Sequence, residues 1–191
     1  LQTVRLESPN QIEGLDPSDM SGTPVLLNPS EGVYSLELAT EQALENDAKS
    51  LALQLNSALQ QVAADPKAKV CILFIGKYLS NSEQAVQTWI AQDMPRHMLS
   101  FELPLIAHLE APGHALGWLM ASCCDLLICQ RSGHYELANA RSSAQALTLL
   151  QKRWGAAITQ ADSPLAGEQL QTFIPGLALL PANSSRSDTQ E

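Results

Sequence analysis

The sequence has few basic residues and no long hydrophobic run. Eleven Lys and Arg residues stand against twenty Asp and Glu residues, which leaves a formal net charge of -9 over 191 residues. A surface of that sign repels phosphates, so we exclude nucleic acids and anionic membranes as partners. No apolar run reaches the roughly 18 to 20 residues that span a bilayer, and the N-terminus lacks the pattern of a signal peptide. The sequence therefore predicts a cytoplasmic protein.

Cysteine is scarce and does not follow the spacing of a metal site. The four cysteines, Cys71, Cys123, Cys124 and Cys129, all lie in strongly apolar stretches. The adjacent pair departs from the spacing of a zinc knuckle, and no pair of histidines completes a ligand set. We expect four buried thiols that act as small hydrophobic residues, with no metal and no cofactor.

The composition changes at both ends of the chain. Residues 8–32 are rich in Pro, Gly, Ser, Asp and Asn, and the chain again becomes polar from Pro181 onward. The sequence predicts a linker or irregular segment over residues 1–30, one domain over residues 31–181, and a linker-like tail over residues 182–191. This pattern is typical of a domain cut from a longer polypeptide, although ordinary frayed termini produce it too.

Between these ends, apolar runs of strand length alternate with helical patterns. The run KVCILFI is almost continuously apolar, which indicates a strand that is covered on both faces. The predicted elements are strands over residues 33–39, 69–75, 103–109 and 125–129, and helices over residues 41–64 and 82–99. Alternating strands and helices predict an α/β fold with a mainly parallel sheet.

Residues 103–130 combine a strand, a glycine-containing loop and a short apolar helix. The strand ends at Glu110, Gly113 lies in the loop, and Gly117 lies where the helix begins. A glycine at a strand-to-helix turn lets main-chain N–H groups approach a ligand oxygen, and the helix N-terminus adds positive partial charge. The same glycines could instead serve only a tight turn and close helix packing, and spacing alone does not separate these two readings.

The segment GHALGWLMASCCD, residues 113–125, resembles the pattern G-x-A-x-G-G-G-x-x-x-x-x-x-D of the crotonase or enoyl-CoA hydratase superfamily. The elements around it follow the family order, from KVCILFIG through SGHYELAN to PLAGEQLQTFIPGLALLP, so the resemblance covers about residues 30–181. It implies a fold of ββα units with a mainly parallel sheet, truncated at the C-terminus. Among the branches of this family, the sequence most resembles the crotonase-like domains of polyketide synthases that introduce β-branches.

The resemblance also implies an oxyanion hole, and this sequence departs from it in both halves. One N–H donor of the family lies in the loop after the KVCILFI strand, which here begins at Gly76 and lacks the A/S-x-G-x-D sequence. The other belongs to the glycine after the one that matches Gly117, and that position is Trp118, followed by Leu119. We expect the indole of Trp118 to fill the acyl pocket, because burying a ring of this size is strongly favourable.

Family hydratases use two glutamates as acid and base, and neither has a counterpart here. The first falls at Ala121, and the second falls near residues 140–143, which carry no carboxylate. Without them hydration lacks a proton route. Lys77 and His114 are weak candidates to bind a substrate carboxylate, as polar residues of decarboxylating relatives do. Their simpler interpretations are a solvated side chain, for Lys77 and its neighbour Tyr78, and a helix-capping residue, for His114.

Two hypotheses about function follow from the resemblance. In the first, the chain is a catalytically inactive domain of a polyketide synthase that serves dimerisation, domain spacing or docking of an acyl carrier protein. In the second, it is an active decarboxylase or hydratase that acts on an acyl group held by carrier protein or coenzyme A. The family trimer uses helices beyond the segment that ends at Pro181, so we expect a homodimer instead.

Overall fold

The computed structural model describes residues 26–38, 48–77, 79, 82–137, 144–160 and 164–181. The predicted tail, most of the predicted N-terminal segment and the start of the first predicted helix lie outside these residues. The elements are β1 (Leu26–Ser30), β2 (Val33–Leu38), α1 (Ala48–Ala64), β3 (Val70–Ile75), α2 (Glu83–Ala91), α3 (Met94–Leu99), β4 (Leu105–Leu109), α4 (Ala115–Ser122), β5 (Leu126–Gln130), β6 (His134–Tyr135), α5 (Ala144–Trp154), η3 (Ala156–Gln160), β7 (Leu165–Ala166), α6 (Gly167–Leu170) and β8 (Ala178–Leu180).

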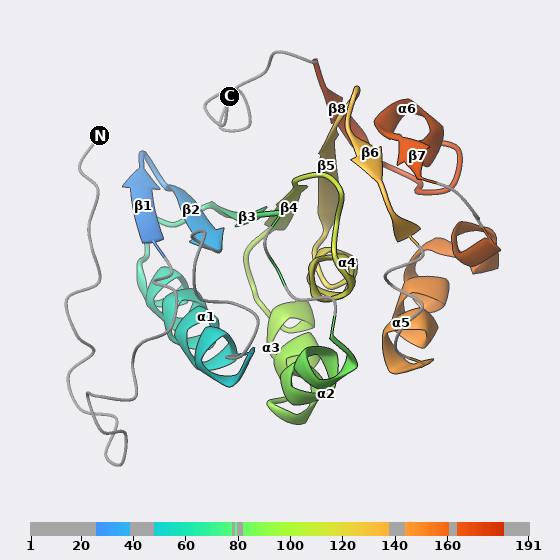
Figure 1. Ribbon diagram of the computed structural model, residues 1–191. Coiled ribbons are helices and arrows are strands. Elements are labelled where there is room, and N and C mark those ends of the chain that lie inside the picture. The colour runs from blue at the N-terminus through green and yellow to red at the C-terminus, as the bar shows by residue number, and fades with distance from the viewer. Residues whose placement is uncertain are drawn as a thin grey trace.

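Six strands form the main sheet, in the order β1-β2-β3-β4-β5-β8 (Figure 1). The strands from β2 to β8 pair in parallel, and only β1 pairs antiparallel to its neighbour. A separate antiparallel pair, β6 and β7, lies beyond the β5 and β8 end of the sheet. The predicted α/β fold with a mainly parallel sheet is therefore confirmed.

Helices α1, α2, α3 and α4 cover one face of this sheet (Figure 1). The core combines alternate strand positions such as Leu73 and Ile75 with the apolar stripe of α1, to which Leu51, Leu55 and Leu59 belong. Spacings of three and four residues place this stripe on one side of the helix, and the period of two places every second strand residue under it. The two periodicities in the sequence thus select the same buried layer.

Two segments differ from the sequence prediction. Residues 26–30, which we assigned to the irregular N-terminal segment, form β1 and pair with β2 through a turn at Glu31 and Gly32, whose φ angles are 49° and 91°. The predicted helix over residues 82–99 is two helices, because the chain reverses at Asp93, where φ is 55°. Asp adopts this left-handed conformation more readily than most residues do, so no glycine is needed at the break. The apolar spacing continues across it, and periodicity alone therefore does not reveal it.

Candidate functional site

The candidate site lies at the carboxyl ends of β3 and β4, where open parallel sheets commonly bind ligands. Ile75 and Leu109 are register partners at these ends, and the N–H of Glu110 donates to the Ile75 carbonyl at 3.0 Å. The loop that starts at Gly76 and the glycine segment that starts at Glu110 therefore leave the sheet side by side. The structure thus brings together the two segments that the resemblance assigns to an oxyanion hole.

Helix α4 begins directly after the glycine segment, with His114 at its N-cap. Gly113 has a φ of 72°, a left-handed conformation that glycine adopts without strain. The N–H of Trp118 donates to the His114 carbonyl at 2.9 Å, which is the first bond of the helix. The Trp118 N–H, at the position that the resemblance assigns to an oxyanion donor, is therefore committed to α4. The N–H groups that a helix leaves without an internal carbonyl belong to its first turn, here residues 115–117.

Gly117 packs against aliphatic side chains of β3, of β4 and of the loop after β3. A Cβ atom on Gly117 would lie 3.1 Å from Ile75 Cγ2, 3.2 Å from Leu109 Cδ1 and 3.7 Å from Leu79 Cδ1. Leu79 comes from the loop after β3 and is only 2% exposed. An acyl oxygen bound by N–H groups of both loops would have to lie between the two loops. Where this space meets α4, the methyl groups of these isoleucine and leucine side chains line it. The close-packing interpretation of Gly117 fits this geometry.

The Trp118 side chain points toward β6 and α5. It is fully buried, and its ring meets those of Tyr135 and Trp154 edge to face, each at a centroid distance of 6.1 Å. Its Nε1 atom lies 2.8 Å from where a Cβ on Gly113 would stand. This contact explains why residue 113 has no side chain. The indole fills space between α4, β6 and α5, whereas Leu79 and Ile75 contact the helix at Gly117.

Helix α4 carries no charged side chain. All eight of its residues are buried, and Ala121, which occupies the place of the first family glutamate, is 1% exposed. A carboxylate there would be costly without a partner. The place of the second glutamate, residues 140–143, lies outside the described residues. The described part of the site therefore offers no acid and base pair along α4.

The two weak binding candidates lie in different settings. Lys77 is exposed, and its neighbour Tyr78 lies outside the described residues. His114 caps α4 through its main-chain carbonyl rather than its side chain, as the simpler interpretation predicts. Its buried Nδ1 atom, like Nε1 of Trp118, has no hydrogen-bond partner in the described part of the protein.

Sequence reasoning missed the role of Tyr135. Its hydroxyl accepts from the Gln130 N–H at 2.9 Å and donates to the Leu109 carbonyl at 3.2 Å. The hydroxyl thus links the ends of β4 and β5 where their own pairing stops, and burial raises the pKa of Tyr135. A tyrosine within SGHYELAN gives no sign of this partner, because Leu109 lies 26 residues earlier in the chain.

All four cysteines are buried free thiols, as predicted. Burial raises the pKa of Cys71 and of Cys129 to about 12, and that of Cys123 to about 11. Such thiols carry almost no thiolate near neutral pH and are poor nucleophiles. The described residues hold no group of three or more His, Cys, Asp or Glu residues that could bind a metal, and they include no helix long and apolar enough to cross a membrane.

Comparisons with known proteins find similarity in structure but not in sequence. No family model matches the chain, and no curated protein matches it. A methylmalonyl-CoA decarboxylase in complex with 2-nitronate-propionyl-CoA superposes with a TM-score of 0.70 at 14% identity, over 89% of this chain and 74% of that one. The ECH2 decarboxylase domain of CurF from Lyngbya majuscula superposes with a TM-score of 0.63 at 19% identity, over 87% of this chain and 75% of that one.

An enoyl-CoA hydratase from Mycobacterium smegmatis gives a TM-score of 0.66 at 15% identity, over 87% of this chain and 73% of that one. Matches at this level of identity report on the fold. The chain has the α/β fold of the crotonase and enoyl-CoA hydratase enzymes.

Proposed function

We propose that this chain is a catalytically inactive crotonase-fold domain that serves a structural role in a cytoplasmic polyketide synthase. That role is dimerisation, spacing of neighbouring domains or docking of an acyl carrier protein. The observation that carries the proposal is the packing of Leu79, Ile75 and Leu109 around Gly117. The synthase setting rests on the sequence resemblance and on the linker-like composition of residues 8–32.

The aliphatic packing argues against binding of a thioester oxygen. Stabilising the negative oxygen of an enolate needs positioned N–H donors, usually the largest single contribution to such catalysis. Here the buried Leu79 side chain lies beside Gly117, in the first turn of α4, where such donors would have to act. The Trp118 N–H would still be unavailable, because it is bonded to the His114 carbonyl.

The chemistry of α4 argues against hydration as well. A carboxylate that activates water typically supplies about two to four decades of rate. Ala121 and its neighbours on α4 provide none, and the helix is buried along its whole length. An inactive domain can retain Gly113 and Gly117 for packing alone, because a Cβ atom at either position would crowd the side chains around it.

An active decarboxylase is the second candidate. Two of the structures reported above are decarboxylases by name. The sequence resemblance implies that decarboxylating relatives do without the two glutamates. His114 Nδ1 and Trp118 Nε1 are buried and have no hydrogen-bond partner among the described residues, and the two residues lie one helical turn apart. Two such side-chain groups could hold a ligand carboxylate or oxygen in place of the main-chain donors.

A turnover assay separates the two candidates. The purified chain is incubated with a 3-methylglutaconyl thioester and with an enoyl thioester, each on coenzyme A and on acyl carrier protein. Release of carbon dioxide and loss of the enoyl absorbance are recorded, with buffer as the blank. We expect rates equal to the blank, whereas turnover well above it would overturn the proposal. Calorimetry with an unacylated carrier protein tests docking separately.

A further inference from the structure

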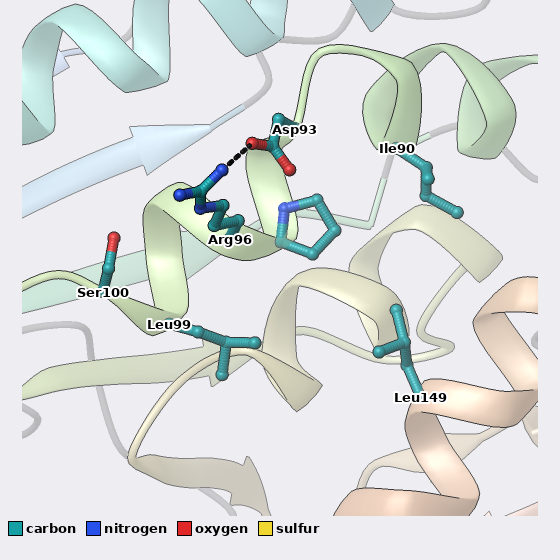
Figure 2. A pocket seen from close by; sticks show the side chains of 7 residues that line it. Ile90, Asp93, Arg96, Leu99, Ser100 and Leu149 are labelled. Carbon is teal, nitrogen blue, oxygen red and sulfur yellow. Dashed lines mark hydrogen bonds and ion pairs between the residues drawn. The ribbon is translucent and has the colours of Figure 1, made fainter.

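A shallow apolar groove lies on the helical side of the molecule, away from the candidate site. It encloses about 460 Å³ and is lined by Ile90, Asp93, Pro95, Arg96, Leu99, Ser100 and Leu149. These residues come from the end of α2, from α3 with the residue on each side of it, and from α5. Figure 2 shows Leu99 and Leu149 on opposite sides of the hollow, with Ile90 above it.

Leu99 on the groove rim is the one large hydrophobic side chain that is exposed in the described part of the chain, with 62% of its surface accessible. It ends α3, and the partly buried Ile90 and Leu149 lie beside it in the groove. Water contacts both the exposed leucine and the apolar hollow beside it. Burying the two against another surface would therefore be favourable. The patch therefore carries both a protruding apolar side chain and a hollow able to receive one.

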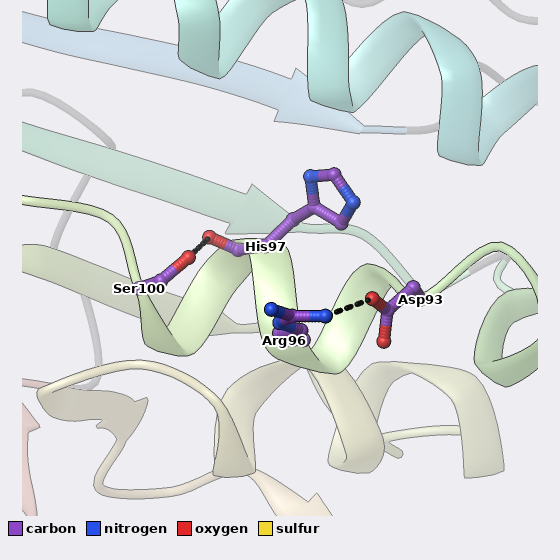
Figure 3. Close-up of polar contacts among 4 residues, drawn as sticks. All are labelled: Asp93, Arg96, His97 and Ser100. Atoms are coloured by element: carbon purple, nitrogen blue, oxygen red, sulfur yellow. Dashed lines mark hydrogen bonds and ion pairs between the residues drawn. The ribbon is translucent and has the colours of Figure 1, made fainter.

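The rim of the groove carries one charge of each sign. Arg96 Nη1 lies 3.5 Å from Asp93 Oδ2, and the two side chains are 82% and 57% exposed (Figure 3). An exposed pair at this distance is worth little within one chain. Both ends of the pair therefore remain available to form better contacts with an opposite charge.

We propose that this groove is the contact surface between two copies of this chain, related by a two-fold axis. Such a contact uses the same patch twice, so the patch must complement itself in shape and in charge. Leu99 of each copy would enter the hollow between Ile90 and Leu149 of the other. Asp93 of each copy would face Arg96 of the other, which turns one weak internal pair into two pairs across the interface.

Charge also selects a second copy over an unrelated acidic or basic partner. The chain has a net charge of -9, so most faces of two copies repel each other. The groove rim is locally neutral and therefore lacks that repulsion. A strongly charged partner would gain no net attraction from one Asp and one Arg. The inference deepens the structural role proposed above, and it depends on that role only for its biological meaning.

The first test is the molecular mass in solution by light scattering and sedimentation equilibrium. The wild-type chain should be a dimer, and Leu99→Asp should raise the dimer dissociation constant at least about 30-fold, as expected for a central contact residue. Gln60→Asp makes the same charge change at an exposed position of α1 and should leave the dimer unchanged. A wild-type monomer, or a dimer or trimer that Leu99→Asp leaves intact, would overturn the proposal.

The second test uses the exchange of charges. Asp93→Lys gives each copy two cations at the rim, and Arg96→Glu gives each copy two anions, so each variant alone should be largely monomeric. Mixed in equal amounts, they should form a heterodimer, because every cation then meets an anion. Circular dichroism of each variant controls for folding. Mixing that restores no dimer would contradict the two-fold arrangement, and the result does not depend on any turnover assay.

Discussion

Replacing Trp118 tests whether the indole is part of the core or a plug in an acyl pocket. The side chain is fully buried and meets Tyr135 and Trp154 edge to face. Removing a buried tryptophan typically costs about 3 to 5 kcal/mol. The two edge-to-face contacts, each worth about 0.5 to 1.5 kcal/mol, place Trp118 in the upper part of that range. Nε1 has no hydrogen-bond partner among the residues that the structure describes, so we add no hydrogen-bond contribution to this loss.

We expect Trp118→Ala to lower the free energy of unfolding by about 4 to 5 kcal/mol, which corresponds to a fall in melting temperature of about 8 to 20 °C for a chain of this size. The matched control is Trp154→Ala, which removes a ring that is only partly buried and should cost less. The double variant should show a coupling of about 0.5 to 1.5 kcal/mol, because the two rings touch. Urea unfolding and thermal melting measure all three.

The same variant separates packing from binding. If Trp118 closes an acyl pocket, its removal should allow an acyl-pantetheine to bind, with calorimetry as the readout. We expect no binding, because Leu79 and Ile75 still contact α4 at Gly117. A loss of stability below about 1.5 kcal/mol would mean that the ring is not a core residue. Tight ligand binding by Trp118→Ala would show that the indole, rather than Leu79, closes the site.

Three further predictions concern single contacts. Tyr135→Phe removes a hydroxyl that serves two main-chain groups, so it should cost about 1 to 3 kcal/mol in urea unfolding, and an unchanged midpoint would refute the bridge. The Tyr34 hydroxyl donates to Asp65, and this bond lowers the pKa of the carboxyl and raises that of the phenol. The stability that this bond adds should be lost as pH falls through the lowered pKa of Asp65 and as pH rises through the raised pKa of Tyr34. Tyr34→Phe should therefore weaken the dependence of the melting temperature on pH in both ranges. Buried thiols such as Cys71, whose pKa is raised to about 12, should react with a thiol reagent at pH 8 only after denaturation, and rapid labelling of the native chain would contradict their burial.

Local pattern was enough to predict the layers of this protein. Strand β3 is an apolar run and α1 carries apolar residues every three or four positions, so each element reveals its type and its buried face without its neighbours. The short helix after Gly113 follows in the same way from a glycine turn and an apolar stretch. The parallel sheet was a further step, because alternating strands and helices leave few other topologies.

The sequence failed where pairing partners are distant or where short-range signals conflict. Residues 26–30 contain Pro29 and resemble a linker, but β2 offers them an edge to pair with. Asp93 breaks a helix that apolar spacing alone continues. In both segments the deciding interaction is a main-chain conformation or a pairing that the side-chain pattern does not encode.

The candidate site depended most on tertiary structure. The sequence determined that α4 carries Trp118 and Ala121 where the resembling family carries glycine and glutamate, and hence which groups are missing. Only the fold decided that Trp118 faces Tyr135 and Trp154 while Leu79 meets Gly117. The direction of a side chain on a buried helix depends on which neighbours leave room for it. Those neighbours come from the loop after β3, from β6 and from α5, which precede and follow α4 in the chain.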